Sequence, residues 1–264
     1  MVGKVARRQK NVDASPSASI RQRAYVYIRR KIAEGELQAG NPISELDLAK
    51  ELGSSRTPIR EAISQLVAEG LLEQNQAGSV FVMQFTREDI LDLCELREAL
   101  ETFALTKVTR LGLMQPGDKI SLQKLAEAIK ALKDELQKSG KIALNADQMS
   151  RFIAADFNFH ALLMGLSQNA RIHKVVNETH LLMRIFTMRK RGHSAEDLER
   201  IYKQHKELIE AIERGDCSDV TRVISAHLQA SQRERLEEFD QHKREASIRN
   251  TMSAFQEMYQ PFMH

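Results

Sequence analysis

Residues 55–71 read SRTPIREAISQLVAEGL, and this stretch decides the fold of the N-terminal part of the chain. Apolar residues in it recur at the spacing of one helix face, which predicts a helix buried on that side: Ile59, Ile63, Leu66 and Val67. Polar side chains project from the other sides, near the start of the helix: Arg56, Thr57, Arg60 and Ser64. A helix that reads the major groove of DNA needs this arrangement, because arginine pairs bidentately with guanine.

The segments around this helix complete a winged helix-turn-helix over residues 18–84. Apolar residues every four positions predict a first helix over 20–32, and Ser44 starts a second one that runs to Leu52. Residues 53–55 form a tight turn before the third helix. Residues 71–73 and 80–82 alternate as a hairpin around Asn75–Gly78, which predicts the wing.

Positive charge is concentrated at the start of the chain. Before residue 32 there are nine Lys and Arg residues, opposed by Asp13 alone. Such local charge favours a polyanion such as the DNA backbone. We interpret residues 1–17 as a basic flexible tail.

Residues 35–82, GELQAGNPISELDLAKELGSSRTPIREAISQLVAEGLLEQNQAGSVFV, closely resemble the N-terminal domain of the GntR family of bacterial regulators. The resemblance runs from about Ile20 to Val82 and implies a DNA-binding transcription regulator. It also implies DNA contacts, with one of them at the tip of the wing: Ser55, Arg56, Thr57, Arg60 and Gly78. Some members of the fatty-acid-regulator branch carry an arginine on the second helix where this chain has Leu46, so the resemblance does not extend to a contact from that helix.

The sequence from about residue 87 to 240 is almost continuously helical in period. Breaks near residues 111–117, 139–140, 167–169, 192–193 and 215–216 divide it into about six helices. The expected fold is therefore mainly α, a winged helix-turn-helix followed by an all-helical, antiparallel bundle. Residues 241–264 form a C-terminal extension, either helical or loose.

Polar residues interrupt the apolar faces of three of these helices. Asp156 and His160, at i and i+4, share one face, while His205 and His227 lie in the apolar stripes of two later helices. Any one of them alone indicates a buried, hydrogen-bonded group. Unpaired polar groups in a core cost about 1–3 kcal/mol each, and one divalent cation would satisfy all four. Imidazoles with a carboxylate suit zinc, nickel or iron.

This second block resembles the ligand-binding FCD domain of the FadR branch, on the pattern D-x3-H, a distant His, and a His in AHL. The resemblance implies a metal at Asp156, His160, His205 and His227, with zinc first among zinc, nickel, manganese and iron. It also implies a carboxylate-bearing metabolite bound beside the metal.

An arginine in an apolar stripe supplies a second indication of an acid-binding pocket. Arg97 needs an anion there, and the alternatives are Glu101 at i+4 or a ligand carboxylate. Arg184 and His180 are weaker candidates for the rim. Of the other histidines, His173 is ambiguous, and three are expected to be exposed or terminal: His193, His242 and His264.

Composition narrows the class of protein. Hydrophobic residues make up 42% and charged residues 28% of the 264 residues, Trp is absent, and the two cysteines are far apart. We expect a cytoplasmic protein without a membrane span. We also expect a homodimer, because the two half-sites of an operator usually mirror a two-fold protein. It would bind double-stranded operator DNA, most simply as a repressor, and sense a small organic acid. The alternatives are a purely structural metal without an effector, or a metal-dependent enzyme, which we do not favour because nucleophile and phosphate-loop motifs are missing.

Overall fold

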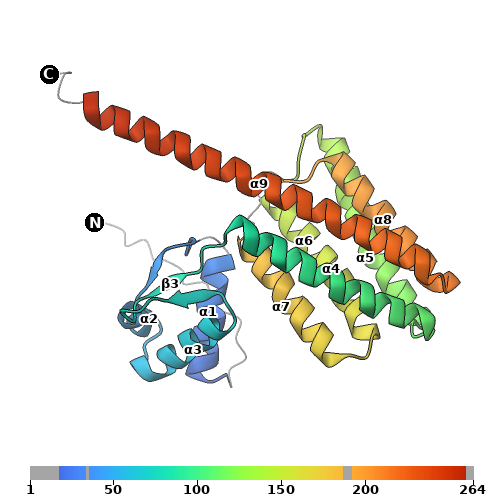
Figure 1. The fold of residues 1–264 in the computed structure, drawn as a ribbon, viewed down its shortest axis with the longest axis horizontal. Helices are drawn as coiled ribbons and strands as arrows, with labels where there is room; N and C mark the ends of the chain where they lie inside the picture. Colours follow the sequence, from blue (N-terminus) through green and yellow to red (C-terminus); the bar gives the residue numbers. More distant parts are fainter. Residues whose placement is uncertain (1–17, 34–35, 187–191, 260–264) are drawn as a thin grey trace, which may run out of the picture. The chain divides into compact units, whose positions relative to one another are not determined.

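The computed structural model describes residues 18–33, 36–186 and 192–259. The chain divides into two compact units, residues 1–84 and residues 85–264 (Figure 1). The basic tail predicted for residues 1–17 lies outside the described residues. Within the described ranges, every helix is too short or too polar to cross a membrane.

The first unit is the predicted winged helix-turn-helix. Its described part consists of α1 (Ile20–Ala33), β1 (Pro42–Ile43), α2 (Glu45–Glu51), α3 (Arg56–Ala68), β2 (Leu72–Gln74) and β3 (Val80–Val82). β3 is the central strand and pairs antiparallel with both β1 and β2. The hairpin of β2 and β3 is the predicted wing. The sequence did not predict β1, because a strand of two residues is too short to show an alternation of apolar and polar residues.

The apolar stripes of α1 and α3 form the core of this unit. Ala24 and Ile28 of α1 and Ile59 of α3 are completely buried where the two helices pack. The Tyr25 hydroxyl also donates a hydrogen bond of 2.7 Å to Glu69 at the end of α3. Since one face of α3 is buried, its opposite face is left to present polar side chains to solvent.

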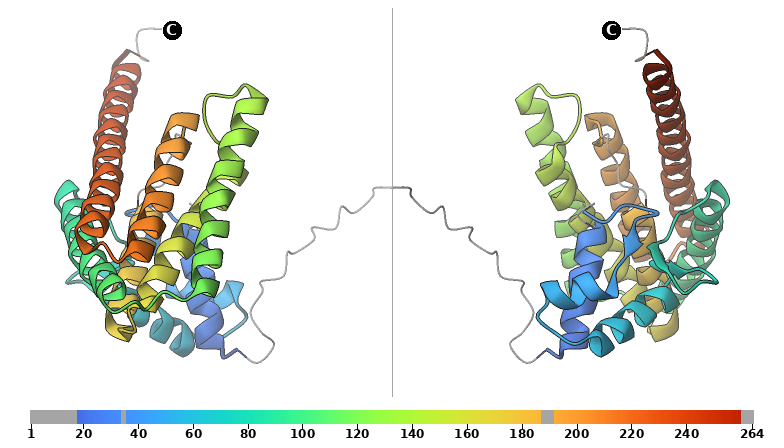
Figure 2. Two further views of the ribbon diagram at one scale, coloured as in Figure 1. Left: turned by 90° about the vertical axis from the view of Figure 1, so that its right-hand side faces the viewer. Right: turned by 90° about the vertical axis from the view of Figure 1, so that its left-hand side faces the viewer.

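The second unit is all-helical in its described part and contains the six predicted helices. They are α4 (Arg87–Arg110), α5 (Pro116–Ser139), α6 (Ala146–Leu166), α7 (Ala170–Phe186), α8 (Ala195–Arg214) and α9 (Cys217–Tyr259). Figure 2 shows α8 lying between α5 and α9, and α8 packs against both. The fold is therefore mainly α, as the sequence predicted.

Local signals explain where these helices begin and end. Thr86, Asn145 and Ser194 each accept a hydrogen bond from the backbone N–H three residues on, and so cap α4, α6 and α8. Gly140 and Gly215 end α5 and α8 with φ of 66° and 73°, a backbone conformation that glycine adopts without strain. These signals are readable from the sequence because capping involves only near neighbours.

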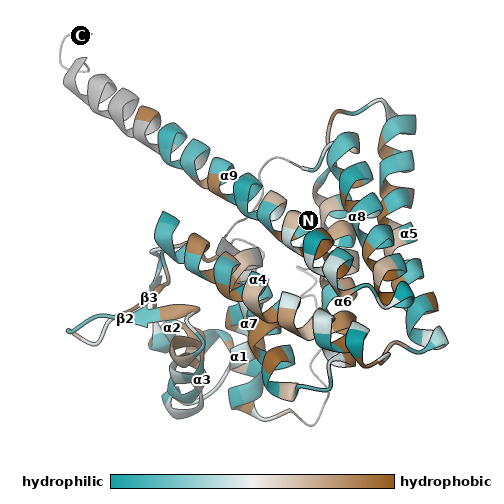
Figure 3. Ribbon diagram, turned by 45° about the vertical axis from the view of Figure 1, so that its right-hand side comes forward, coloured by the Kyte–Doolittle hydropathy of each residue, from teal (hydrophilic) through white to brown (hydrophobic). Residues whose placement is uncertain are grey.

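Helices α4 and α9 run antiparallel along one side of the bundle. Near the start of α4, Arg87 pairs with Asp240 at 3.5 Å, and near its end, Thr106 accepts a contact from the Cys217 thiol at 3.8 Å. The six helices of this unit enclose a continuous core that includes Leu105, Leu122, Phe159, Val176, Leu208 and Ile224. Figure 3 shows mostly hydrophilic residues on the outward sides of α5 and α9.

Helix α9 is longer than the bundle that it covers. It continues as a single helix to Tyr259, so residues 241–259 of the predicted extension are helical (Figure 1). Residues 260–264 lie outside the described part of the chain.

Candidate functional site

The candidate DNA-reading surface lies on the exposed side of α3. Ser55 is the N-cap residue of α3, and the other polar residues of the predicted set follow it on the helix, all of them exposed: Arg56, Thr57, Arg60 and Ser64. Gly78 is exposed in the turn between β2 and β3 with a φ of 83°. A side chain at that φ would be strained, so the tight wing turn requires glycine.

An acidic residue of α2 organises the two arginines of this surface. The carboxylate of Glu45 accepts hydrogen bonds from Arg56 Nη2 at 2.9 Å and from Arg60 Nε and Nη2 at 3.0 and 2.9 Å. The hydrogen bond from Arg60 lowers the pKa of Glu45, together with that from Arg56. Sequence patterns missed this role of Glu45, which was visible there only as an acidic residue in the first turn of α2. Leu46 is exposed beside it.

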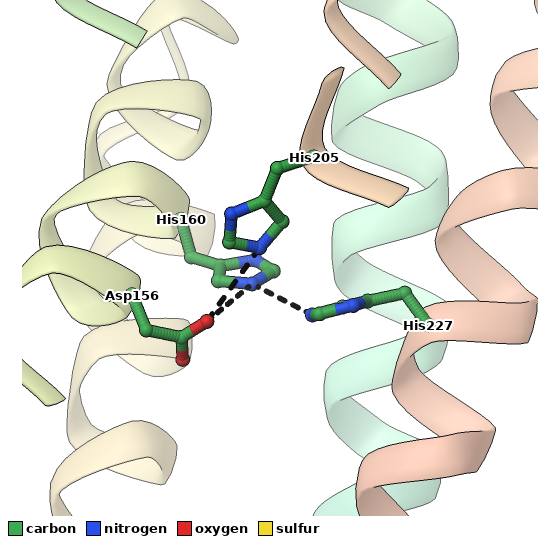
Figure 4. Close-up of side chains that lie close together, drawn as sticks. All are labelled: Asp156, His160, His205 and His227. Atoms are coloured by element: carbon green, nitrogen blue, oxygen red, sulfur yellow. Dashed lines mark hydrogen bonds and ion pairs between the residues drawn. The ribbon is translucent and has the colours of Figure 1, made fainter. Parts of the chain in front are cut away.

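The four predicted ligands meet inside the helical bundle (Figure 4). Asp156 and His160 come from α6, His205 from α8 and His227 from α9. Asp156 Oδ1 lies 3.5 Å from His205 Nε2 and 3.9 Å from His160 Nε2. His160 Nε2 lies 3.2 Å from His227 Nε2. One ligand atom from each of the four residues therefore fits within a sphere small enough for a single cation.

The environment of this cluster matches what a divalent cation requires. Both ring nitrogens of His205 are buried without a hydrogen-bond partner among the described residues, although its ring stacks on Phe159 at a centroid distance of 3.8 Å. Burial lowers the pKa of His205 to about 3 and that of His227 well below its usual value. Neutral imidazoles have free lone pairs for a metal. The residues present therefore fit a divalent cation.

A second set of buried charges adjoins the cluster. Arg97 is 3% exposed and its Nε donates to Glu101, so the i,i+4 ion pair that the sequence offered as one alternative is present. The Nη2 atom of Arg97 is buried without a hydrogen-bond partner in the described structure. Glu101 also contacts His160 Nδ1 at 2.7 Å and His180 Nε2 at 3.3 Å. The sequence did not indicate this link from Arg97 to the cluster.

The remaining candidates differ in their outcome. His180 is buried, and burial followed by the charge of Arg97 lowers its pKa to about 4. Arg184 belongs to α7, but its side chain lies outside the described residues, as do the His242 side chain and His264. The expectation that His193 is exposed was wrong: it is 6% exposed and its ring packs on Phe152 at 4.3 Å. The sequence placed His193 in a break between two helices and gave no sign of this tertiary contact.

Two family models match the chain. Residues 20–82 match the bacterial regulatory proteins of the gntR family, and residues 92–230 match the FCD domain. The two matches together span most of the chain, and the second alone covers more than half of it.

Similar proteins with curated names are transcription regulators. The chain is 28% identical over 204 residues to a probable D-xylose utilization operon transcriptional repressor of Paenarthrobacter nicotinovorans, covering 77% of this chain and 83% of that protein. It is 26% identical over 203 residues to the gluconate operon transcriptional repressor of Bacillus subtilis, with 75% and 78% covered. These relatives are regulators rather than enzymes.

Solved structures share the fold. E. coli McbR/YncC aligns with a TM-score of 0.66 at 17% identity, covering 84% of this chain and 99% of the other. A GntR regulator from Rhodococcus sp. RHA1 aligns with a TM-score of 0.58 at 22% identity, covering 82% and 97%. With its winged helix-turn-helix and its FCD domain, the chain belongs to the GntR family of bacterial regulatory proteins.

Proposed function

We propose that this DNA-binding regulator is a homodimeric repressor whose helical bundle binds a small organic acid beside a divalent cation. The observation that carries the proposal is that buried nitrogen atoms without a hydrogen-bond partner lie within and beside the group of four candidate metal ligands. Arg97 Nη2 and both ring nitrogens of His205 lack a hydrogen-bond partner among the described residues. Leaving such groups unpaired costs about 1–3 kcal/mol each, so a ligand that pairs them is strongly favoured.

DNA reading is assigned to the start of α3 and to the wing. Arg56 and Arg60 are the residues best suited to base edges, because a guanidinium can hydrogen bond to guanine O6 and N7 together. Ser55, Thr57 and Ser64 are suited to the phosphate backbone and base edges, and Gly78 allows the wing to approach a groove closely. The exposure of this whole set supports the assignment.

The cation would be held by Asp156, His160, His205 and His227, with zinc favoured over nickel, manganese or iron for a site rich in imidazole. When bound, the cation supplies positive charge and open coordination positions for an oxygen ligand. Arg97 is the chain's own donor to the acid, because its Nη2 lacks a partner in the described structure. The acid changes DNA affinity only to the extent that it binds one arrangement of the dimer better than the other.

The homodimer is supported by an apolar stripe on α4. Leu96 and Phe103 are 43% and 60% exposed, and Ala99 between them is exposed as well. They lie at i, i+3 and i+7 and therefore share one face of the helix. Pairing of this face with a second copy would bury it, and a two-fold dimer matches the symmetry of operator half-sites.

Three properties of the 264-residue chain test the proposal: its operator affinity, its metal content and its response to acids. An operator fragment is first selected from a random duplex library, and its affinity is followed by fluorescence anisotropy at a fixed salt concentration. Metal content is measured by elemental analysis. Gluconate, malate and citrate are then titrated into the zinc-loaded complex. We expect near-stoichiometric metal and release of the operator by at least one acid.

Two double variants separate the parts of the proposal. Arg56→Ala/Arg60→Ala should retain metal and lose operator binding. His160→Ala/His205→Ala should retain operator binding and lose both metal and the response to acids. If acids never change operator affinity while chelation lowers the melting temperature, the metal is structural and the sensing role is wrong. Folded protein that takes up neither zinc nor nickel would refute the metal site.

A further inference from the structure

Glu101 is a buried charge of the helical bundle that contacts three other charged or titratable side chains. Its side chain is 0% exposed, and it accepts from three residues on three elements: Arg97 on α4, His160 on α6 and His180 on α7. The proposed function uses Arg97 and His160 but gives Glu101 no role. A buried carboxylate with three donors around it is fully satisfied and has little freedom to move.

The contact with His160 involves the nitrogen that faces away from the cluster. Glu101 Oε2 lies 2.7 Å from His160 Nδ1, whereas His160 Nε2 lies near Asp156 and His227. An ionised carboxylate accepts hydrogen bonds but cannot donate one, so Nδ1 of a neutral His160 must carry the hydrogen. The lone pair of that ring then resides on Nε2 and points at the cation position. Such a partner fixes both the tautomer and the orientation of a ligand imidazole.

The charge of Arg97 bears on whether the Glu101 carboxylate could also bind a second cation. Glu101, His160 and His180 also lie close enough together to hold a cation of their own. The guanidinium of Arg97 is hydrogen bonded to that same carboxylate, and its positive charge disfavours a cation there. The geometry thus favours Glu101 as a hydrogen-bond acceptor rather than as a ligand of a second metal.

We infer that Glu101 is a positioning residue that holds His160 in its Nδ1–H tautomer and thereby sets the cation affinity of the cluster, with Arg97 as its counter-ion. This inference rests on the proposed function, because it assigns the second layer of the same site.

The substitution Glu101→Gln alone would leave Arg97 as a buried unpaired charge and could prevent folding. In Arg97→Met the Glu101 carboxylate keeps His160 and His180 as hydrogen-bond partners. The decisive comparison is therefore between Arg97→Met and Arg97→Met/Glu101→Gln in the full chain, since both lack the guanidinium charge. Zinc affinity is measured by competition with a chelating dye, and the tautomer of His160 in the metal-free protein by long-range ¹H–¹⁵N NMR. Thr109→Val is the control, because Thr109 is buried on the same helix and its hydroxyl donates to Leu105 O, away from the cluster.

We expect the double variant to bind zinc about 10- to 100-fold more weakly than Arg97→Met, and Thr109→Val to match the wild type. We also expect the Nδ1–H form of His160 in Arg97→Met and a mixture of tautomers in the double variant. Equal zinc affinities, or the Nε2–H form in Arg97→Met, would overturn the inference and leave the proposed function intact. A wild type that takes up no zinc would overturn both, and two zinc ions per chain would overturn the role given to Arg97.

Discussion

His205 offers the sharpest test of the histidine cluster, because its side chain should destabilise the metal-free protein and stabilise the metal-bound protein. Its side chain is 1% exposed, and both of its ring nitrogens lack a hydrogen-bond partner among the described residues. The substitution His205→Leu removes these polar atoms and keeps a side chain of similar volume. The metal-free protein should therefore become more stable, while the zinc-loaded protein should become less stable.

The magnitudes follow from burial and from linkage. An unpaired buried polar group costs about 1–3 kcal/mol, and a volume-conserving replacement costs less than about 1.5 kcal/mol. A net gain of about 1 kcal/mol is therefore expected for the metal-free variant. Zinc at a hundred times its dissociation constant stabilises the wild type by about 2.7 kcal/mol. His205→Leu should lose most of this increment, because one of the four ligands is gone.

The assay is urea unfolding followed by circular dichroism, with chelator and with zinc. His173→Leu is the matched control, because His173 is a half-buried histidine of α7 outside the cluster. It should keep the full zinc increment. A metal-free His205→Leu protein clearly less stable than the wild type would refute the argument from unpaired nitrogens. An unchanged zinc increment would refute the assignment of His205 as a ligand.

Four further predictions concern other parts of the chain. Arg60→Lys should weaken operator binding about tenfold by removing a bidentate contact. Glu45→Gln should lower the ratio of specific to non-specific DNA affinity without weakening non-specific binding. Fluorescence anisotropy measures both effects. Phe103→Glu should yield a folded monomer in light scattering; a persistent dimer would exclude the α4 face. Burial, aided by Glu69, raises the pKa of Tyr25 to about 12, so its contribution to stability is present below pH ~10 and is lost as pH rises toward 12. Tyr25→Phe should abolish that loss in alkaline unfolding curves and cost about 1 kcal/mol at neutral pH.

The sequence by itself determined the helices, their ends and their buried faces. Caps such as Ser44 and Ser194 and the break at Gly215 act on their nearest neighbours, and a repeat such as Ile59, Ile63 and Leu66 needs only the pitch of a helix. The same periodicity was sufficient to place the four clustered side chains on inward faces of three helices. It could not show how closely their atoms approach, since the distance between helices depends on packing.

Only the tertiary structure decided which residues become partners across the fold. Glu101 meets His160 although 59 residues separate them, and Glu45 meets Arg60 from 15 residues away. His193 is buried against Phe152 on a different element, contrary to expectation. Helical periodicity says which face of a helix is buried but not which side chain stands opposite. That choice is made by the packing of the helices, and it turns an ordinary i,i+4 ion pair at Arg97 into a link with the histidine cluster.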